Sequence, residues 1–241
     1  MQLFMTAGAA AGVARSAVIK IGGHVLFDGV ELNVGYVREL KDALVEAAGA
    51  YDWLAVVVGG GELARRYVEW GRELGLNDSA LDMIGIRVAA TNAALLWAYF
   101  HGVAPPSIPS SLQEAVAMLP AWRVVFLGGL QPAQSTTTVA ALLAEAVRAE
   151  KLVIATDVDG VYSDDPRRNP AATRFEEIAA SELEKMFSGG LVAGGYRLLD
   201  PLTLAVLRRS GIEAYVVAGR PPRNIVRALR GERIGTRILP K

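Results

Sequence analysis

The chain has 241 residues, enough for one large domain or two small ones. Its 25 Lys and Arg residues balance 25 Asp and Glu residues, and the resulting net charge of zero argues against a general nucleic-acid binder. There is no cysteine and there are only two histidines, which excludes disulfides and thiolate metal sites and disfavours a histidine-rich zinc site.

The first 15 residues, MQLFMTAGAAAGVAR, are rich in Ala and Gly. Their only basic residue comes at the end, so the charged-then-apolar order of a secretory signal is missing. We expect residues 1–15 to form a disordered leader. No uncharged apolar run reaches the roughly 18 residues of a membrane span, so we expect a cytoplasmic protein with no membrane partner.

After the leader, apolar periodicity predicts strands and helices in alternation. The predicted elements are a strand 17–23, a helix 34–50, a strand 53–58, helices 62–74, 80–100 and 112–118, a strand 123–127, a helix 139–149, a strand 152–155, helices 181–187 and 201–210, a strand 213–217, a helix 225–229 and an edge strand 236–239. The segment 157–173 is expected to be a loop. This alternation favours an α/β fold, in which helices cover both faces of a mostly parallel sheet.

Three predicted strands end in consecutive glycines, Gly22-Gly23, Gly59-Gly60-Gly61 and Gly128-Gly129. A glycine turn lets the backbone approach a ligand, and a helix after it presents free N–H groups to an anion. Arg65 and Arg66 are placed to reach the same anion. Any single turn is also a plain strand-to-helix connection, and neither a Walker P-loop nor a dinucleotide fingerprint is present. The recurrence predicts a phosphate-binding edge at the carboxyl ends of the strands.

Several polar residues near this edge allow two interpretations. Lys20, at the end of the first strand, either neutralises a phosphoryl group during transfer or reaches water along its own stem. The run 131–138, QPAQSTTT, contains a helix cap. Its four hydroxyl residues and two glutamines exceed what capping needs, and they suit a phosphate monoester.

Carboxylates follow two further predicted elements. The loop Thr156–Tyr162, with Asp164 and Asp165 after it, contains an Asp-Gly turn and also suits a base and ribose pocket or a hydrated Mg²⁺. Asp200, which precedes a proline, is typical of a helix cap. Asp82 has the ordinary position of an acidic residue near a helix start.

These residues fall into six ordered motifs. They are KIGG (Lys20 to Gly23), GGGELARRY (Gly59 to Tyr67), LDMIGI (Leu81 to Ile86), GGLQPAQSTT (Gly128 to Thr137), TDVDGVYSDDP (Thr156 to Pro166) and LLDPL (Leu198 to Leu202). As a set they resemble the amino acid kinase family and, within it, the archaeal-type UMP kinases. The resemblance implies a three-layer αβα sandwich over residues 16–241 as a single domain, with an acceptor-binding part of about 16–150 and an ATP-binding part of about 151–241.

The resemblance also implies transfer of the γ-phosphoryl of ATP to UMP, giving UDP for pyrimidine nucleotide synthesis. Mg²⁺ is then expected through the nucleotide phosphates, with no protein metal site. Lys20 would stabilise the transferring phosphoryl and Asp200 would orient the catalytic cations. The implied ATP-binding residues are Gly22, Gly23, His24, Gly61, Arg65, Thr156, Asp157, Tyr162 and Asp165. The implied UMP-binding residues are Gly60, Asp82, Leu130, Gln131, Pro132, Ala133, Gln134, Ser135 and Thr136.

The family further implies a homo-hexamer built as a trimer of dimers, and we expect the apolar helix 80–100 to be a dimer surface. This sequence departs from the family pattern at four positions. Ala133 stands where Gly is usual, Asp157 where Asn is usual, Thr203 where the motif has Ala, and His24 where Ser or Lys is common. None of these changes removes an implied catalytic charge.

Other functions of the same scaffold stay open from the sequence. Isopentenyl phosphate kinases carry a characteristic histidine after the second glycine turn, where this chain reads Glu62-Leu63-Ala64-Arg65-Arg66. Acetylglutamate kinase binds a carboxylate acceptor, which suits this chain less well. A non-catalytic nucleotide-binding storage or regulatory protein is an alternative of another class, and the presence of both Lys20 and Asp200 argues against it.

Overall fold

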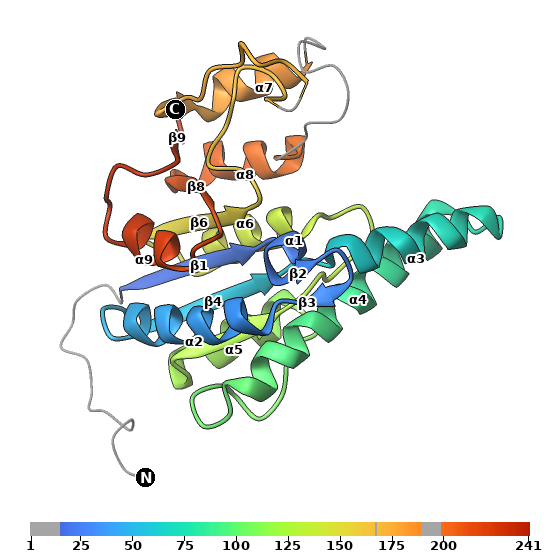
Figure 1. The fold of residues 1–241 in the computed structure, drawn as a ribbon. Coiled ribbons are helices and arrows are strands. Elements are labelled where there is room, and N and C mark those ends of the chain that lie inside the picture. The colour runs from blue at the N-terminus through green and yellow to red at the C-terminus, as the bar shows by residue number, and fades with distance from the viewer. Residues whose placement is uncertain (1–14, 167, 189–198) are drawn as a thin grey trace.

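The computed structural model of the protein describes residues 15–166, 168–188 and 199–241. Figure 1 shows one central sheet with helices against both of its faces. The expected leader falls on residues 1–14, which lie outside the described residues, and on Arg15. The backbone N–H of Arg15 donates to Asp52 Oδ2 at 2.8 Å, and its side chain donates to Glu150 at 3.3 Å. These hydrogen bonds hold Arg15 in the fold, so the expectation of a disordered leader is wrong for this residue.

Seven strands form the central sheet, in the spatial order β5-β4-β1-β6-β8-β9-β7. They are β1 (Ser16–Ile21), β4 (Trp53–Val58), β5 (Val124–Leu127), β6 (Lys151–Thr156), β7 (Glu177–Ala179), β8 (Ala214–Ala218) and β9 (Thr236–Leu239). All neighbouring pairs are parallel except β8 with β9. The predicted α/β fold with a mostly parallel sheet is confirmed.

Helices cover both faces of the sheet because successive side chains of each strand point to opposite faces. One face, which includes Ile19, is covered by α2 (Val34–Ala48), α4 (Asp78–Tyr99) and α9 (Arg223–Leu229). The other, which includes Val18, is covered by α5 (Leu112–Met118), the 3₁₀ helix η1 (Leu119–Ala121), α6 (Thr136–Ala146), α7 (Ala180–Ser188) and α8 (Pro201–Ser210). The remaining long helix, α3 (Gly61–Glu73), packs along the first part of α4, and α3 with the start of α4 extends away from the sheet (Figure 1).

The same alternation fixes the direction of Lys20. On β1, Lys20 is in register with Val57 of β4 and Ile154 of β6. Both of these side chains belong to the cluster beneath α6 and α8. The side chain of Lys20 therefore leaves the sheet on the face where α6 and α8 begin.

Two predicted elements differ from the structure by more than two residues or in their position in the sheet. α6 begins at Thr136, three residues before the predicted start, because Ser135 caps it by accepting the backbone N–H of Thr138 at 3.0 Å. It ends at Ala146, three residues early, and Arg148 has a positive φ of 50°. The strand predicted at the sheet edge, β9, is not at the edge, because β7 pairs with its outer side.

The periodicity does not predict five short elements. They are α1 (Gly23–Leu26), β2 (Phe27–Asp28), β3 (Glu31–Leu32), η1 and β7. The antiparallel hairpin of β2 and β3 turns through Gly29, whose φ is +63°. Elements of two to four residues are too short to show a period. Of the apolar residues at helical spacing in α2, Val37, Leu40 and Leu44 are buried, whereas Val45 is 51% exposed.

Candidate active site

Two of the three glycine turns touch each other at the carboxyl end of the sheet. A Cβ added to Gly23 would lie 2.1 Å from the backbone nitrogen of Gly61, so only glycine fits there. The backbone N–H of Gly59 also donates to the carbonyl of Ile21 at 2.9 Å. The third turn packs on α4, since a Cβ on Gly128 would lie 2.5 Å from the nitrogen of Ala90. The three turns thus border one edge.

The start of α3 is suited to an anion. Its first residue, Gly61, has a φ of +67°, and the preceding Gly60 provides no side-chain cap. The buried Asn92 of α4 holds this turn by donating to the carbonyls of Gly59 and Gly60 at 2.9 and 3.2 Å. The first N–H groups of α3, with the positive end of the helix dipole, therefore face the glycine-lined edge. Nothing in the sequence singles out Asn92.

Lys20 is a cation in an otherwise apolar strand. Burial lowers the pKa of Lys20 to about 8, and the nearby negative charge of Asp157 opposes this shift. An anion bound beside a buried ammonium group favours its charged form. This environment favours the phosphoryl-neutralising interpretation of Lys20 over the solvent-reaching one.

His24 and Arg65 lie near each other beside this lysine. Burial, and after it the positive charge of Arg65, lowers the pKa of His24, and Asp157 opposes the shift. His24 is therefore a neutral imidazole at pH 7. Arg66, which the sequence offers as a second anion-binding group, instead pairs with Glu62 at 3.2 Å along α3. Of the two arginines, only Arg65 is placed by this electrostatic network at the candidate phosphate site.

A cavity of about 180 Å³ opens next to the glycine turns. It lies between the starts of α3 and α4 and the segment after β5. Five of the implied acceptor-binding residues line it, namely Gly60, Asp82, Gln131, Gln134 and Thr136, together with Gly61 and Gly129. The remaining lining is apolar or glycine, from Ala64, Val68, Leu81, Gly85, Ile86 and Ala89. This combination of few polar groups and apolar walls is typical of a small-molecule site.

The other implied acceptor residues, Leu130, Pro132, Ala133 and Ser135, do not line this cavity. Ala133 donates its backbone N–H to Asp82 Oδ2 at 2.7 Å and has a φ of 61°, a conformation that glycine adopts more easily. Leu130 lines a separate cavity of about 260 Å³ beside α5. Pro132 is exposed. Ser135 turns toward Asp200, to which its hydroxyl donates at 2.5 Å.

Asp200 caps α8, as its sequence context predicts. It accepts the backbone N–H of Thr203 at 2.9 Å. Its carboxylate is half-buried, and although burial raises its pKa, hydrogen bonds from Ser135 and from Thr203 and Thr138 lower it overall. Asp200 therefore remains ionised at neutral pH, on the face of the sheet to which Lys20 points.

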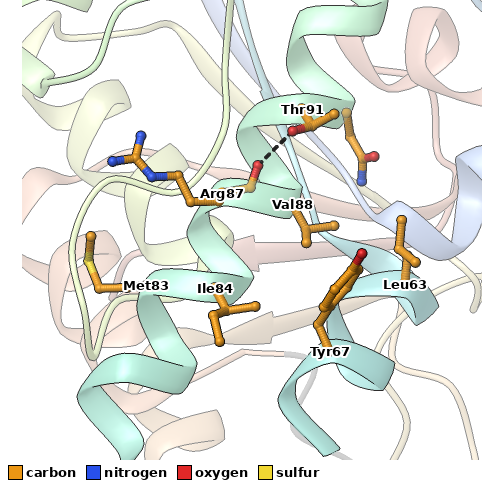
Figure 2. Close-up of a pocket in the computed structure, with 8 residues that line it drawn as sticks. Leu63, Tyr67, Met83, Ile84, Arg87, Val88 and Thr91 are labelled. Atoms are coloured by element: carbon orange, nitrogen blue, oxygen red, sulfur yellow. Dashed lines mark hydrogen bonds between the residues drawn. The ribbon is translucent and has the colours of Figure 1, made fainter. Parts of the chain in front are cut away.

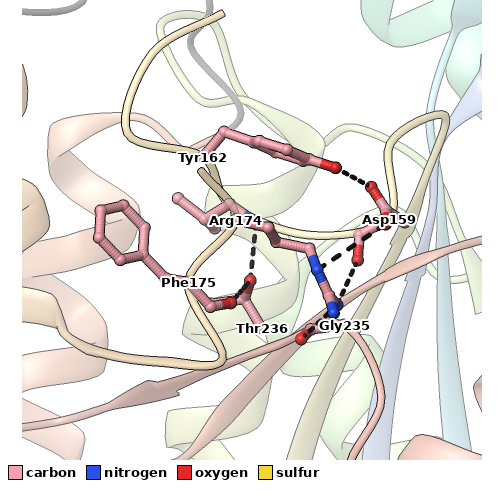
Figure 3. A network of polar contacts seen from close by, with 7 residues as sticks. Asp159, Tyr162, Arg174, Phe175, Gly235 and Thr236 are labelled. Atoms are coloured by element: carbon pink, nitrogen blue, oxygen red, sulfur yellow. Dashed lines mark hydrogen bonds and ion pairs between the residues drawn. The ribbon is translucent and has the colours of Figure 1, made fainter. Parts of the chain in front are cut away.

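The loop after β6 is fixed by contacts to β9 (Figure 3). Tyr162 donates its hydroxyl to Asp159 Oδ1 at 2.7 Å. Arg174 donates to the carbonyl of Gly235 at 2.8 Å and to that of Asp159 at 3.3 Å. Thr236 accepts the backbone N–H of Val161 at 2.8 Å. The loop that carries the implied ATP-binding residues Tyr162 and Asp165 is thus anchored by partners, Arg174 and Thr236, that no sequence motif marks.

Within residues 15–166, 168–188 and 199–241, no three His, Asp or Glu side chains come together as a metal-binding group. Thr156 donates its hydroxyl to Asp157 at 3.2 Å, so both implied ATP-binding residues lie at the end of β6, next to β1. The carboxyl edge therefore combines a partly buried lysine, glycine turns, a helix start and a small cavity. This arrangement can hold two anions side by side.

Comparison with known proteins agrees with this chemistry. The sequence profile of the amino acid kinase family matches residues 15–218. A uridylate kinase from Thermofilum pendens is 50% identical over 229 residues, which span 92% of this chain and 97% of that protein. A uridylate kinase from Pyrobaculum neutrophilum is 41% identical over 223 residues, spanning 92% of this chain and 99% of that protein.

Solved structures give the same result. The crystal structure of uridylate kinase from Archaeoglobus fulgidus matches with a TM-score of 0.82 at 36% identity, over 92% of this chain and 99% of that one. The UMP kinase from Bacillus anthracis matches with a TM-score of 0.79 over 95% of this chain and 97% of that one, and at 20% identity it supports the fold. The chain belongs to the amino acid kinase family and, within it, to the uridylate kinases.

Proposed function

We propose that the protein transfers the γ-phosphoryl group of ATP to UMP, forming UDP and ADP, in the cytoplasm and for pyrimidine nucleotide synthesis. The observation that carries this proposal is the meeting of Lys20, the Gly23–Gly61 contact and the 180 Å³ cavity at one edge of the sheet. A donor and an acceptor phosphate bound there lie next to the same partly buried cation. Positioning and charge neutralisation supply most of the acceleration in such a transfer.

The acceptor occupies the small cavity in this proposal. A phosphate oxygen of UMP attacks the γ-phosphorus, the bond from that phosphorus to the β–γ bridging oxygen breaks, and ADP leaves with the electron pair. Asp82 is beside the acceptor ribose, and Gln131, Gln134 and Thr136 surround the acceptor phosphate. Among the described residues that line this cavity there is no histidine. That lining favours a nucleotide acceptor over isopentenyl phosphate.

The donor lies along the glycine turns. Gly22, Gly23 and Gly61 let the phosphates approach the backbone, and the N–H groups at the start of α3 receive them. The adenosine extends toward the end of β6, where Thr156, Asp157, Tyr162 and Asp165 are found. His24 and Arg65 flank the phosphates. Mg²⁺ arrives as part of the MgATP substrate, held by phosphate oxygens and water.

Lys20 and Asp200 have different roles in the transfer. The ammonium group of Lys20 neutralises charge that develops on the equatorial oxygens of the moving phosphoryl. Asp200 stays ionised and orients the cations around it. Neither forms a covalent intermediate, because a nucleotide phosphate is itself the nucleophile.

A coupled assay of ADP release tests this function. The protein is incubated with MgATP and, separately, UMP, CMP, isopentenyl phosphate or no acceptor. We expect ADP release with UMP that exceeds each of the other three reactions. A higher rate with isopentenyl phosphate, or a rate independent of any acceptor, contradicts the proposal.

We propose that the face formed by α3 and α4 packs against a second copy of the chain, within a trimer of dimers. Five exposed large apolar side chains lie on these two helices, Tyr67, Trp70, Met83, Leu95 and Tyr99, and two more, Leu74 and Leu76, lie in the turn that joins them. An apolar cavity of about 430 Å³ lies between the two helices, and Tyr67, Met83 and Ile84 are among the residues that line it (Figure 2). α4 is long and apolar enough to span a membrane by length and composition, with only 28% of its apolar window buried. A second copy would cover this surface.

Light scattering tests this assembly. We expect the mass of a hexamer for the unmodified chain and a smaller species for Trp70→Glu. Val45→Glu is the matched control, because Val45 is also 51% exposed but lies on α2. A monomeric unmodified chain, or equal dissociation by both substitutions, contradicts the assignment of this face.

A further inference from the structure

Three hydroxyl groups and one backbone N–H surround the carboxylate of Asp200. The hydroxyl of Ser135 donates to Oδ2 at 2.5 Å, and that of Thr138 lies 2.8 and 2.9 Å from Oδ1 and Oδ2. Thr203 donates twice, from its backbone N–H to Oδ1 and from its hydroxyl to Oδ2, both at 2.9 Å. A helix cap needs only the first of these two bonds from Thr203.

The two threonines are the buried part of this cluster. Thr138 and Thr203 have no solvent-exposed surface, and their hydroxyl oxygens are 3.0 Å apart. Each hydroxyl has a single proton, and a carboxylate can only accept. If Asp200 rotated away, a buried donor would lose its charged acceptor, which is costly where no water can replace it. The pair therefore restricts the carboxylate to one orientation.

The cluster joins two distant parts of the chain. Ser135 caps α6 and belongs to the loop 130–136 that borders the acceptor cavity, and Thr138 lies in the first turn of α6. Asp200 and Thr203 open α8, which packs on α6 (Figure 1). Both helices lie on the face of the sheet toward which Lys20 points. A shift of the Asp200 side chain is therefore coupled to a shift of the C-terminal end of the acceptor loop.

Thr203 is also the position at which this sequence departs from the Asp-x-x-Ala pattern of the motif it resembles. An alanine there keeps the backbone N–H bond to Asp200 but supplies no hydroxyl. The hydroxyl bond from Thr203 to the carboxylate of Asp200 is thus one that the motif does not require.

We propose that Thr138 and Thr203 are positioning residues for phosphoryl transfer, whose paired buried hydroxyls orient the carboxylate of Asp200 and dock the end of the acceptor loop against α8. They touch neither nucleotide. The inference rests on the proposed role of Asp200 in the kinase reaction. Its consequence is a loss of turnover, larger than any loss of nucleotide binding, when either hydroxyl is removed.

The test compares Thr138→Val, Thr203→Val and the double variant with the unmodified protein. Steady-state kcat and both KM values are measured at a temperature well below each variant's Tm. We expect each single variant to lose about tenfold in kcat, with both KM values changed less than about threefold. The double variant should lose much less than the product of the two, because both hydroxyls act on one carboxylate. Thr203→Ser should recover most of the kcat, since it restores the donor.

Tyr51→Phe is the matched control for a merely structural role. The hydroxyl of Tyr51 is also buried and donates to the carbonyl of Leu229 at 2.9 Å, but it precedes β4, at the opposite end of the sheet from the site. We expect Tyr51→Phe to lower Tm and leave kcat unchanged. If the Thr138 and Thr203 variants behave the same way, the positioning role is wrong. If Thr203→Val fails to fold, Thr203→Ala replaces it with the same expected kcat loss.

The unmodified protein in the same assay separates this inference from the proposed function. If it phosphorylates no UMP but does phosphorylate another acceptor, the proposed function fails and the comparison is made with that acceptor. If it phosphorylates UMP and the threonine variants retain full kcat, the proposed function stands and the positioning role fails.

Discussion

Asp82 and Ala133, which are 51 positions apart in the sequence, are joined by a hydrogen bond of 2.7 Å from the backbone N–H of Ala133 to the carboxylate of Asp82. This bond ties the first turns of α4 to the loop that borders the acceptor cavity. It shows that Asp82 has a task in the protein without any nucleotide, beyond a favourable charge near a helix start. The two roles can be separated by substitution.

Replacing Asp82 with Asn should raise KM for UMP by about ten- to a hundredfold, because a hydrogen bond to a charged group contributes about 1.5–3 kcal/mol. The amide oxygen of Asn can still accept the N–H of Ala133, so the loop stays in place and KM for MgATP stays nearly unchanged. Asp78→Asn is the control, since Asp78 is an exposed carboxylate on the same helix. Equal increases in KM for both nucleotides would indicate damage to the start of α4 instead.

Ala133→Gly should stabilise the protein. Ala133 has a φ of 61°, which strains any residue with a Cβ. Relief of about 1 kcal/mol corresponds to roughly 2–4 °C in Tm for a chain of this size. Ala117→Gly, at an exposed position inside α5, should lower Tm because glycine destabilises a helix interior. Differential scanning calorimetry measures both, and a lower Tm for Ala133→Gly contradicts the strain argument.

The titration of Lys20 predicts the pH dependence of the free enzyme. Burial depresses the pKa of Lys20 to about 8, so the ammonium form is lost as pH rises through that value. kcat/KM for MgATP, which reports ionisations of the free enzyme, should therefore fall above pH 8. kcat should hold to higher pH, because bound phosphates favour the charged form. The residual kcat/KM of the Lys20→Arg variant should show no fall above pH 8. If this variant shows the same fall as the unmodified protein, the titrating group is not Lys20.

The same depressed pKa of Lys20 predicts the direction in which stability changes with pH. Between pH 8 and about 10.5 the unfolded chain retains the proton on Lys20 that the folded chain has lost. The contribution of Lys20 to the free energy of unfolding should therefore increase across this window. Thermal melts of the unmodified protein and of Lys20→Met, without nucleotides, isolate this contribution. If the difference in Tm between the two proteins does not change with pH, burial does not lower the pKa of Lys20.

Gly85→Ala should separate stability from acceptor binding. Gly85 lies inside α4 and lines the 180 Å³ cavity, and a Cβ there would meet no other atom within 4 Å. Alanine should stabilise the helix by up to about 1 kcal/mol while its methyl group narrows the cavity, so Tm rises and KM for UMP rises with it. Gly35→Ala in the first turn of α2 should leave KM unchanged. An unaltered KM in Gly85→Ala contradicts the placement of UMP.

Much of the fold follows from local sequence signals. The strands β1 and β4 read as buried apolar runs ended by glycines, and α4 and α8 begin where Asn77 and Asp200 cap them. The start of α6 does not follow, because four consecutive hydroxyl residues offer four possible caps. β7 is only three residues long, and its pairing with β9 depends on the tertiary fold.

The site is predictable where its residues form motifs and unpredictable where they are brought together by folding. The glycine turns predict a phosphate-binding edge. The contact between Gly23 and Gly61, however, forms only when the sheet is assembled, and the sequence does not predict it. The hydroxyl of Thr203 reaches Asp200 one helical turn away, whereas that of Thr138 comes from a helix about sixty residues earlier. Arg66 looks equivalent to Arg65 in sequence, but in the structure Arg66 pairs with Glu62 whereas Arg65 lies near His24.

The most direct test of the central claim is the fate of the γ-phosphoryl group. The protein is incubated with MgATP labelled in the γ position and with UMP, and the products are separated. The account predicts that the label appears in UDP, and that Lys20→Met lowers this rate by about 10²- to 10³-fold while KM for each nucleotide changes little. Label that stays in ATP or appears only as inorganic phosphate, or a Lys20→Met variant with unchanged kcat, would contradict it.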